Sequence, residues 1–282
     1  MSGNDDVTVV IPCFGYGRFL GEAVESALGQ EGGSPRVIVV DDGSTDAETL
    51  RALDELPPDV EALRQANAGV AAARNAGAAA ADTPLLLMLD ADDRLRPRAL
   101  ATLRAPLEAE PALGFAYGDA EFFGAWSGRL AFPDFDGYRL LYRSIVTATS
   151  LIRREAFEAV GGFDESLPGY EDWDLYLGAL EHGWQGRRVP EVVLDYRRHE
   201  SSRLAGDRGD YRRRYRAIRA KRAALYGRAG ELARASSLAP AGRLFYRTWW
   251  AWRPLPAAVE QTLYRVALRA AARLRARSTS SA

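Results

Sequence analysis

Apolar runs alternate with amphipathic stretches along the first 110 residues of the chain. Strands are predicted at residues 7–11, 36–40, 60–65 and 85–89, and the unbroken apolar run at 85–89 is typical of a strand buried on both faces. Four segments with apolar residues at helical spacing follow them, at residues 18–28, 47–56, 70–81 and 97–107. The first strand is predicted to stop at Pro12, because proline lacks a backbone N–H. This β-α-β-α order predicts a doubly wound α/β fold with a mostly parallel sheet.

The α/β pattern continues less regularly through the second half of the chain. Further strands are predicted at residues 115–123, 147–152 and 188–195, and further helices at residues 154–160 and 173–181. The aromatic, irregular stretch 124–142 is predicted to be a long loop, a kind of segment that often carries function.

Three carboxylates follow the apolar run of the segment LLLMLDADD. Asp90, Asp92 and Asp93 are therefore expected at the carboxyl end of a central strand, where open α/β sheets bind ligands. On an extended chain, Asp90 and Asp92 would point the same way, about 7 Å apart. Carboxylates held together favour a divalent cation such as Mg²⁺ or Mn²⁺, which prefers oxygen ligands and substrate phosphate. The alternative interpretation is an acidic turn that caps the next helix.

A second acidic pair, Asp41 and Asp42, follows the strand predicted at residues 36–40 and is expected at the same edge of the sheet. A glycine-rich loop follows the first strand, with Gly15, Gly17 and Gly21. The third glycine comes one residue too late for the dinucleotide-binding fingerprint, so we expect no nicotinamide or flavin site.

Composition limits the class of protein. The 282 residues, 47% of them hydrophobic, suit one large α/β domain with an appendage. A single cysteine, Cys13, excludes an intramolecular disulfide and indicates a reducing compartment. The sequence shows no signal peptide and no membrane span, so we expect a cytoplasmic protein.

Charge is distributed unevenly along the chain. Residues 201–282 contain 19 Arg and Lys against 4 Asp and Glu, whereas the first 200 residues contain 18 against 34. Trp249, Trp250 and Trp252 precede an Arg-lined helix predicted at residues 257–277. A basic, aromatic appendage predicts peripheral contact with an anionic membrane face. The alternatives are packing of these helices on the acidic part of the chain or on a second subunit of a homodimer.

Seven segments, in order, resemble the family 2 glycosyltransferases, which have the GT-A fold. They read VVIPCFGYGRFL, VVDDGSTD, QANAGVAAARNAG, LLLMLDADD, GGFDESL, YEDWDLYL and YRRH. The resemblance implies a GT-A domain over residues 1–202 and leaves a helical basic region over residues 203–282. It implies transfer of a sugar, usually with inversion at the anomeric carbon, from a nucleotide-diphosphate sugar to a carbohydrate, lipid-linked or other hydroxyl acceptor. Such a protein would take part in polysaccharide, glycolipid or glycoconjugate synthesis, and no nucleic-acid partner is expected.

The resemblance also implies roles for single residues. The nucleotide-sugar would contact Pro12, Phe14, Asp41, Asp42, Asn67, Arg74, Asp90 and Ala91. Asp92 matches the ligand of the divalent cation (Mn²⁺ or Mg²⁺), and Asp90 lies beside it. Asp93 is an alternative ligand, because the register of the motif is ambiguous. His199 lies where some relatives carry a histidine ligand.

Asp172 matches the catalytic base, which takes the proton of the acceptor hydroxyl, with Glu171 and Trp173 placed at the acceptor. Trp173 could instead pack in the core, and His199 could be an ordinary hydrogen-bonded residue.

Two other functions remain open from the sequence. A sugar-1-phosphate nucleotidyltransferase has a related nucleotide-binding fold, but normally carries a Gly-rich loop with a basic residue after its first strand. Here that loop holds Phe14, Tyr16 and one arginine, Arg18. A non-catalytic nucleotide-sugar-binding module would not need the acidic set of Asp90, Asp92 and Asp172.

Overall fold

The structure, a computed structural model of the chain, describes residues 4–125, 127–167, 169–199 and 211–251. Its strands are β1 (Val7–Cys13), β2 (Arg36–Asp41), β3 (Val60–Arg64), β4 (Leu85–Met88), β5 (Arg94–Leu95), β6 (Leu113–Gly124), β7 (Gly128–Leu130), β8 (Leu151–Arg153) and β9 (Gln185–Arg198). Its α-helices are α1 (Gly17–Leu28), α2 (Ala47–Asp54), α3 (Val70–Ala80), α4 (Ala99–Ala109), α5 (Gly137–Leu140), α6 (Arg154–Val160), α7 (Glu171–Glu181), α8 (Tyr211–Lys221), α9 (Ala223–Gly227), α10 (Ala229–Ala235) and α11 (Pro240–Phe245). A 3₁₀ turn (Asn4–Asp6) precedes β1, and a π-helical turn (Tyr246–Trp250) follows α11.

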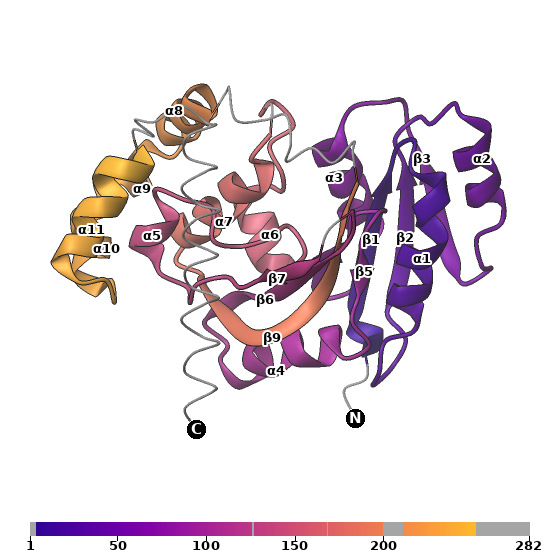
Figure 1. Cartoon of the computed structure of the whole chain (residues 1–282), viewed down its shortest axis with the longest axis horizontal. Coiled ribbons are helices and arrows are strands. Elements are labelled where there is room, and N and C mark those ends of the chain that lie inside the picture. The colour runs from indigo at the N-terminus through magenta and orange to yellow at the C-terminus, as the bar shows by residue number, and fades with distance from the viewer. Residues whose placement is uncertain (1–3, 126, 168, 200–210, 252–282) are drawn as a thin grey trace.

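One sheet runs through the described part of the chain, with strand order β3-β2-β1-β4-β8-β6-β9-β5 and β7 paired to β6 (Figure 1). Neighbouring strands from β3 to β4 are parallel, as the β-α-β-α pattern predicts. Beyond β4 the sheet is mixed, because β8 runs antiparallel to both β4 and β6, while β6 and β9 are parallel.

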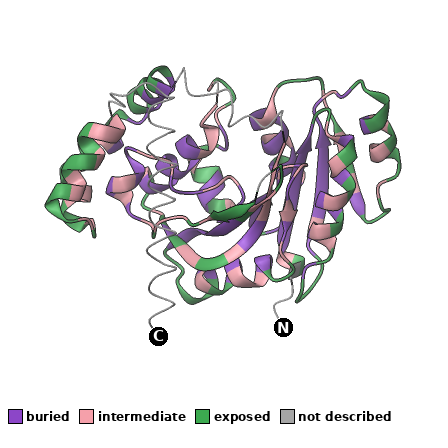
Figure 2. Ribbon diagram, viewed as in Figure 1, coloured by how far each residue is buried: buried purple, intermediate pink, exposed green. Residues whose placement is uncertain are grey.

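Both faces of the central strands are covered, which explains their unbroken apolar runs. Alternate residues of β1 pack into different cores: Val9 lies with Leu20 of α1 and Leu103 of α4, whereas Val10 lies with Ala73 of α3. Figure 2 shows the buried strands at the centre of the molecule and more exposed helices at its ends.

The predicted stop of the first strand at Pro12 was wrong, because β1 continues to Cys13 and pairs Pro12 with Val40. Val10 accepts a hydrogen bond from Leu89 on the β4 side. The N–H that Pro12 lacks would also face β4, where the paired register ends at Met88. Proline therefore costs this strand no ladder hydrogen bond.

The region 124–152 differs from its prediction in two places. The predicted long loop contains β7 and α5. The strand predicted at residues 147–152 is reduced to β8, because residues before it make local side-chain hydrogen bonds that compete with a strand. The backbone N–H of Thr149 donates to the Thr147 hydroxyl, and the Ser144 hydroxyl donates to the carbonyl of Val146.

The C-terminal helices lie at the opposite end of the molecule from α2 (Figure 1). Asp174 of α7 is fully buried and accepts hydrogen bonds from Arg222 at 2.8 and 2.9 Å and from Lys221 at 2.7 Å. Removing one partner of a buried ion pair typically costs about 3–5 kcal/mol. Part of the basic region therefore packs on the acidic first part of the chain, which is one of the alternatives that the charge distribution leaves open.

Other predictions for the basic region concern residues that the structure does not describe. Trp252 and the helix predicted at residues 257–277 lie outside the described residues, and the boundary at 202/203 stays a prediction. Within the described ranges, no helix is both long and apolar enough to cross a bilayer.

Candidate active site

The order of the strands creates a crevice at the carboxyl edge of the sheet. From β1 the chain moves outward through β2 and β3, then returns to place β4 on the other side of β1. Ligands of open α/β sheets bind where the strand order reverses in this way. The loops that follow β1, β2 and β4 all open at this edge, and they carry the predicted site residues Phe14, Asp42, Asp90, Ala91 and Asp92.

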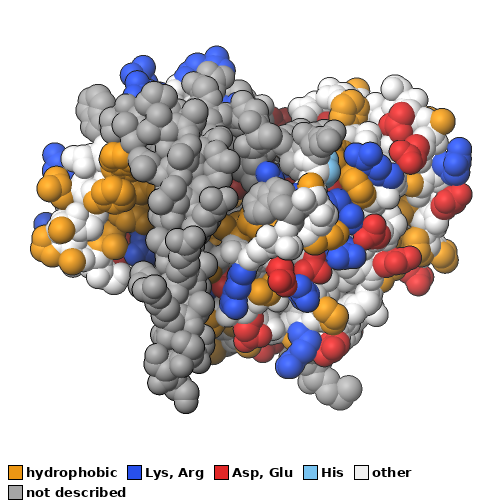
Figure 3. All heavy atoms as spheres, viewed as in Figure 1, with side chains coloured by type: hydrophobic (Ala, Val, Ile, Leu, Met, Phe, Trp, Pro, Cys, Tyr) orange, Lys and Arg blue, Asp and Glu red, His pale blue; other side chains and the backbone are white. Residues whose placement is uncertain are grey.

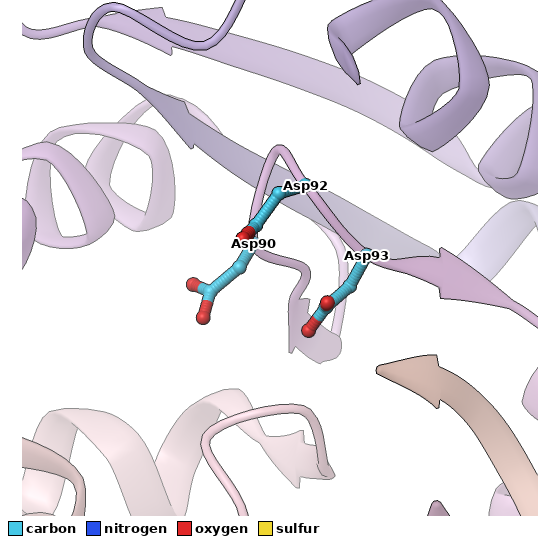
Figure 4. Close-up of side chains that lie close together, drawn as sticks. All are labelled: Asp90, Asp92 and Asp93. Carbon is cyan, nitrogen blue, oxygen red and sulfur yellow. The ribbon is translucent and has the colours of Figure 1, made fainter. Parts of the chain in front are cut away.

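A turn directly after β4 carries the acidic cluster. The backbone N–H of Asp93 donates to the carbonyl of Asp90 at 3.0 Å, so the chain is not extended here and the expected same-facing pair about 7 Å apart was wrong. The turn instead gathers Asp90, Asp92 and Asp93, with one oxygen of each carboxylate within 4.8 Å of the others (Figure 4).

The acidic cluster has the electrostatics of a cation site. Burial, followed by the charge of Asp90, raises the pKa of Asp92, and burial with the charges of Asp90 and Asp92 raises the pKa of Asp93 well above its usual value. Asp93 also accepts a hydrogen bond from the backbone N–H of Arg197 at 2.8 Å. A divalent cation would relieve this repulsion, and three carboxylates are a suitable donor set for Mg²⁺ or Mn²⁺.

His199, just beyond the end of β9, meets the acidic cluster. Its Nε2 lies 2.8 Å from Oδ2 of Asp92, and its ring packs against Tyr16 and Phe19 at centroid distances of 5.7 and 5.4 Å. The histidine is therefore within reach of a cation held by Asp92, and its role as a ligand stays a prediction.

Arg74 of α3 joins the acidic cluster to the start of α7. Its side chain is buried, with Nη2 2.7 Å from Asp90 Oδ1 and Nη1 3.0 Å from Glu171 Oε1. Burial alone would lower the pKa of Arg74, but the charges of Asp90 and Glu171 raise it above its usual value. Arg74 therefore remains a cation and holds two acidic segments together.

Asp172 lies in the first turn of α7, next to Glu171. Burial, and then the charge of Glu171, raise the pKa of Asp172 to about 7. The charge of Arg74 and a hydrogen bond from the backbone N–H of Trp173, at 2.8 Å, lower this pKa by less. A carboxylate with a pKa near neutrality is suited to accept a proton in catalysis. The helix is preceded by Tyr170, whose φ of 64° is rare for a residue with a side chain.

The predicted contact of Trp173 with an acceptor was wrong. Trp173 is only 1% exposed, its Nε1 donates to the carbonyl of Leu140 at 2.7 Å, and its ring stacks near Tyr215 and Tyr211. This side chain is part of the core between α7 and α8, because the indole finds both a partner for its N–H and aromatic neighbours there.

Asp42 organises the loop after β3. Its carboxylate accepts hydrogen bonds from the Gln65 side chain and from the backbone N–H groups of Ala68 and Gly69, each at 2.8 Å. The same loop packs on Gly43, where φ is 81° and an added Cβ would lie 2.8 Å from the backbone nitrogen of Asn67.

The remaining predicted nucleotide contacts differ in how far they are buried. Pro12, Asp41 and Ala91 are buried, whereas Phe14 and Asn67 are exposed. The N–H of Ser44 donates to Asp41 at 2.9 Å. Contact of any of these residues with a nucleotide stays a prediction.

Arg197 has a role at the site that the sequence does not predict. Its Nε donates to the carbonyl of Asp92 at 2.8 Å, its Nη2 donates to Glu22 at 2.8 Å, and its guanidinium lies over the rings of Phe19 and Phe123. Asp92 and Glu22 lie 105 and 175 positions before Arg197 in the sequence, so no local pattern indicates these contacts. Arg197 supports the turn that carries the acidic cluster.

Comparison with known proteins agrees with this geometry. The sequence pattern of glycosyl transferase family 2 matches residues 8–161, and a second pattern, glycosyltransferase like family 2, matches residues 140–229. The chain is 38% identical to the succinoglycan biosynthesis protein ExoO of Rhizobium meliloti over 220 residues, which are 70% of this chain and 62% of ExoO. It is 27% identical to chondroitin synthase of Pasteurella multocida over 184 residues, which are 63% of this chain but 19% of that protein.

Solved structures share the fold. TarS of S. aureus, residues 1–349 in complex with UDP-GlcNAc, has a TM-score of 0.65 at 15% identity, covering 88% of this chain and 74% of that one. The same TarS segment in complex with UDP has a TM-score of 0.60 at 16% identity, covering 84% and 68%.

An α/β sheet with an acidic turn at its switch point thus defines a protein of the GT-A fold, as the sequence predicts. The chain belongs to glycosyl transferase family 2. It spans about a third or less of the length of several curated relatives, among them a Nostoc glycosyltransferase (34%) and the Pasteurella chondroitin synthase (19%).

Proposed function

We propose that this protein is an inverting, metal-assisted glycosyltransferase that moves a sugar from a nucleotide-diphosphate sugar to an acceptor hydroxyl. The observation that carries the proposal is the Arg74 bridge, which brings Asp90 of the acidic cluster and Glu171, next to Asp172, to one guanidinium. A cation-binding cluster and a candidate base are thereby held at the same edge of the sheet. Polysaccharide, glycolipid or glycoconjugate synthesis is the setting that family membership suggests.

In the proposed reaction, Asp172 accepts the proton of the acceptor hydroxyl while that oxygen forms a bond to the anomeric carbon. The bond from this carbon to the departing nucleoside diphosphate breaks in the same displacement, which inverts the configuration. Arg74 keeps Glu171 in place beside Asp172, and Asp42 holds the loop that would line the nucleoside.

A divalent cation would be held by Asp92, with Asp90, Asp93 and His199 within reach, and when bound it would neutralise charge on the leaving diphosphate. Arg197 supports the acidic cluster, because its Nε donates to the backbone carbonyl of Asp92 and its backbone N–H donates to the carboxylate of Asp93. Uridine diphosphate sugars are the first donors to test, since the fold is shared with TarS in complex with UDP-GlcNAc.

Donor hydrolysis and transfer, measured with and without Mn²⁺, separate this function from the alternatives. Release of free nucleoside diphosphate from a panel of nucleotide-sugars is the expected result. Release of pyrophosphate from a nucleoside triphosphate and a sugar 1-phosphate would indicate a nucleotidyltransferase instead. Binding of a nucleotide-sugar without either product would indicate a non-catalytic module.

The pH dependence of transfer should reflect ionisation of Asp172. With a pKa of about 7, the ionised base is lost as pH falls, so kcat should fall about tenfold per pH unit below 7 and level off above it. The stability contribution runs the other way: the raised pKa makes the protonated form favoured on folding, so this contribution is present below about pH 4 and is lost as pH rises through 7.

Rates measured across pH at several Mn²⁺ concentrations check this expectation. Binding of the cation has its own pH dependence, and the positive charge of a bound cation lowers the apparent pKa of Asp172. The acid limb should persist at saturating Mn²⁺ and should be absent from the residual activity of Asp172→Asn. An identical limb in that variant would assign the titration to another group.

We also propose peripheral contact of the C-terminal region with an anionic membrane face in the cytoplasm, with a homodimer as the alternative use of the same surface. On α11, Leu244 and Phe245 are 61% and 47% exposed, close in sequence to the exposed Arg247. An apolar and cationic surface of this kind suits a membrane interface. Co-sedimentation with anionic liposomes that falls as salt rises is expected, and its absence at low salt would leave the region with a structural role.

A further inference from the structure

A second cavity lies away from the acidic cluster, between α5 and the C-terminal helices. It has a volume of about 490 Å³, within the range of about 300–1,000 Å³ that small-molecule sites occupy. Its described lining residues are Tyr138, Tyr142, Arg219, Tyr226, Ala229, Gly230, Ala233 and Arg247. None of them belongs to the candidate active site.

The floor of this cavity is aromatic and rigid. Tyr138 and Tyr142 are buried, with ring centroids 5.1 Å apart, and the Tyr138 hydroxyl donates to the carbonyl of Arg243 at 3.2 Å. The Tyr226 hydroxyl donates to the carbonyl of Leu141 at 2.6 Å. Because these phenols are already fixed, a ligand could pack on the rings without ordering them first.

The rim of the cavity is cationic. Arg219 and Arg247 are exposed, and among the described residues neither has a carboxylate within 4.0 Å. The described lining contains no Asp or Glu. Arg222, one turn along the chain from Arg219, is by contrast fully engaged with Asp174 and Glu181. Two guanidinium groups without acidic partners in the described part of the chain present planar donor pairs that match a carboxylate or a phosphate.

Packing connects this cavity to the helix of the candidate base. The Trp173 indole donates to Leu140, and Tyr226 donates to the next residue, Leu141. Tyr215 lies between them, with its ring 5.7 Å from that of Trp173 and 6.2 Å from that of Tyr226. Hydrogen bonds and packed aromatic rings therefore connect the cavity to the helix that carries the candidate base. In the view of the molecule in Figure 3, acidic side chains are visible on the half away from the C-terminal helices.

We propose that this cavity binds an anionic saccharide, a sugar ring that carries a carboxylate or a phosphate. The tyrosine rings take the sugar face and the two arginines take the anion. As a remote subsite for acceptor or product, this assignment rests on the proposed function, but the binding itself requires neither donor nor cation.

Calorimetric or NMR titration of the full chain, at low salt and without cation or donor, tests the proposal. The ligands are glucose, glucuronic acid, glucose 6-phosphate and inorganic phosphate. At least one charged sugar should bind about tenfold or more tightly than glucose, because hydrogen bonds to charged groups are the stronger ones. Comparison of glucuronic acid with glucose 6-phosphate identifies the preferred anion, and inorganic phosphate should bind more weakly than the sugar phosphate.

The double variant Arg219→Gln, Arg247→Gln should lower the affinity for the charged sugar to that for glucose. Arg234→Gln provides a matched control, since Arg234 is exposed on α10 and is not among the lining residues. Three results would overturn the proposal: glucose binds as tightly as the charged sugars, inorganic phosphate binds as tightly as glucose 6-phosphate, or Arg234→Gln lowers the affinity as much as the double variant does. Saccharide binding in a protein that transfers no sugar would contradict only the proposed function, whereas transfer without saccharide binding would contradict only this site.

Discussion

Asp172→Asn should lower sugar transfer by at least about 10²-fold, the loss typical of a general base, while binding of the donor survives. Asparagine has nearly the same shape but cannot accept the proton of the acceptor hydroxyl. In this protein the substitution should not unfold α7, because a side-chain oxygen remains to accept the hydrogen bond from the Trp173 N–H. The kcat for transfer and the dissociation constant of the nucleotide-sugar are both measured for the variant and for the parent protein.

A matched control separates loss of the base from loss of charge. Glu155→Gln makes the same chemical change at an exposed position in the first turn of α6, and it should leave transfer unchanged. Transfer within a fewfold of the parent in Asp172→Asn would move the base to Glu171. Asp174 is not available for that role, because its carboxylate is buried and engaged with Lys221 and Arg222.

Local pattern was enough to predict the elements that carry the site. The apolar run of β4 is buried on both faces, so its end had to meet the carboxyl edge of the sheet, and Asp90 and Asp92 came with it. The turn itself was not predictable from strand alternation, because the hydrogen bond from Asp93 to Asp90 bends the chain after the strand has ended. Local periodicity therefore predicted which residues lie at the site and not how their carboxylates converge.

Long-range contacts set the rest of the site. Arg74 and Glu171 are 97 positions apart, and their ion pair depends on how α3 and α7 pack. Trp173 was misplaced at the acceptor for a similar reason: its aromatic neighbours, Tyr211 and Tyr215, come from a helix that the sequence indicated only as a basic appendage. The buried pair of Asp174 and Arg222 then makes that helical region part of the support for the candidate base.

Asp92→Ala should abolish cation-dependent transfer and weaken binding of Mn²⁺, while the fold stays intact. Burial, followed by the charges of the neighbouring carboxylates, raises the pKa of Asp92 and of Asp93. Removal of the Asp92 carboxylate therefore relieves an unfavourable electrostatic interaction in the cation-free protein and also removes a ligand. The variant should therefore unfold at the same temperature as the parent or above it in the presence of chelator, and gain less stability from added Mn²⁺.

Titration of Mn²⁺, followed by thermal unfolding with and without the ion, gives a readout that does not depend on turnover. Asp54→Ala is the matched control, because Asp54 is an exposed carboxylate at the end of α2, far from the acidic cluster in sequence. It should leave Mn²⁺ binding and transfer at parental values.

Full transfer by the parent protein in excess chelator would falsify the cation requirement. Unchanged Mn²⁺ affinity in Asp92→Ala would instead assign the ligand role to Asp90, Asp93 and His199. These residues lie at the same turn, where Arg74 contacts Asp90, Arg197 contacts Asp93 and His199 contacts Asp92.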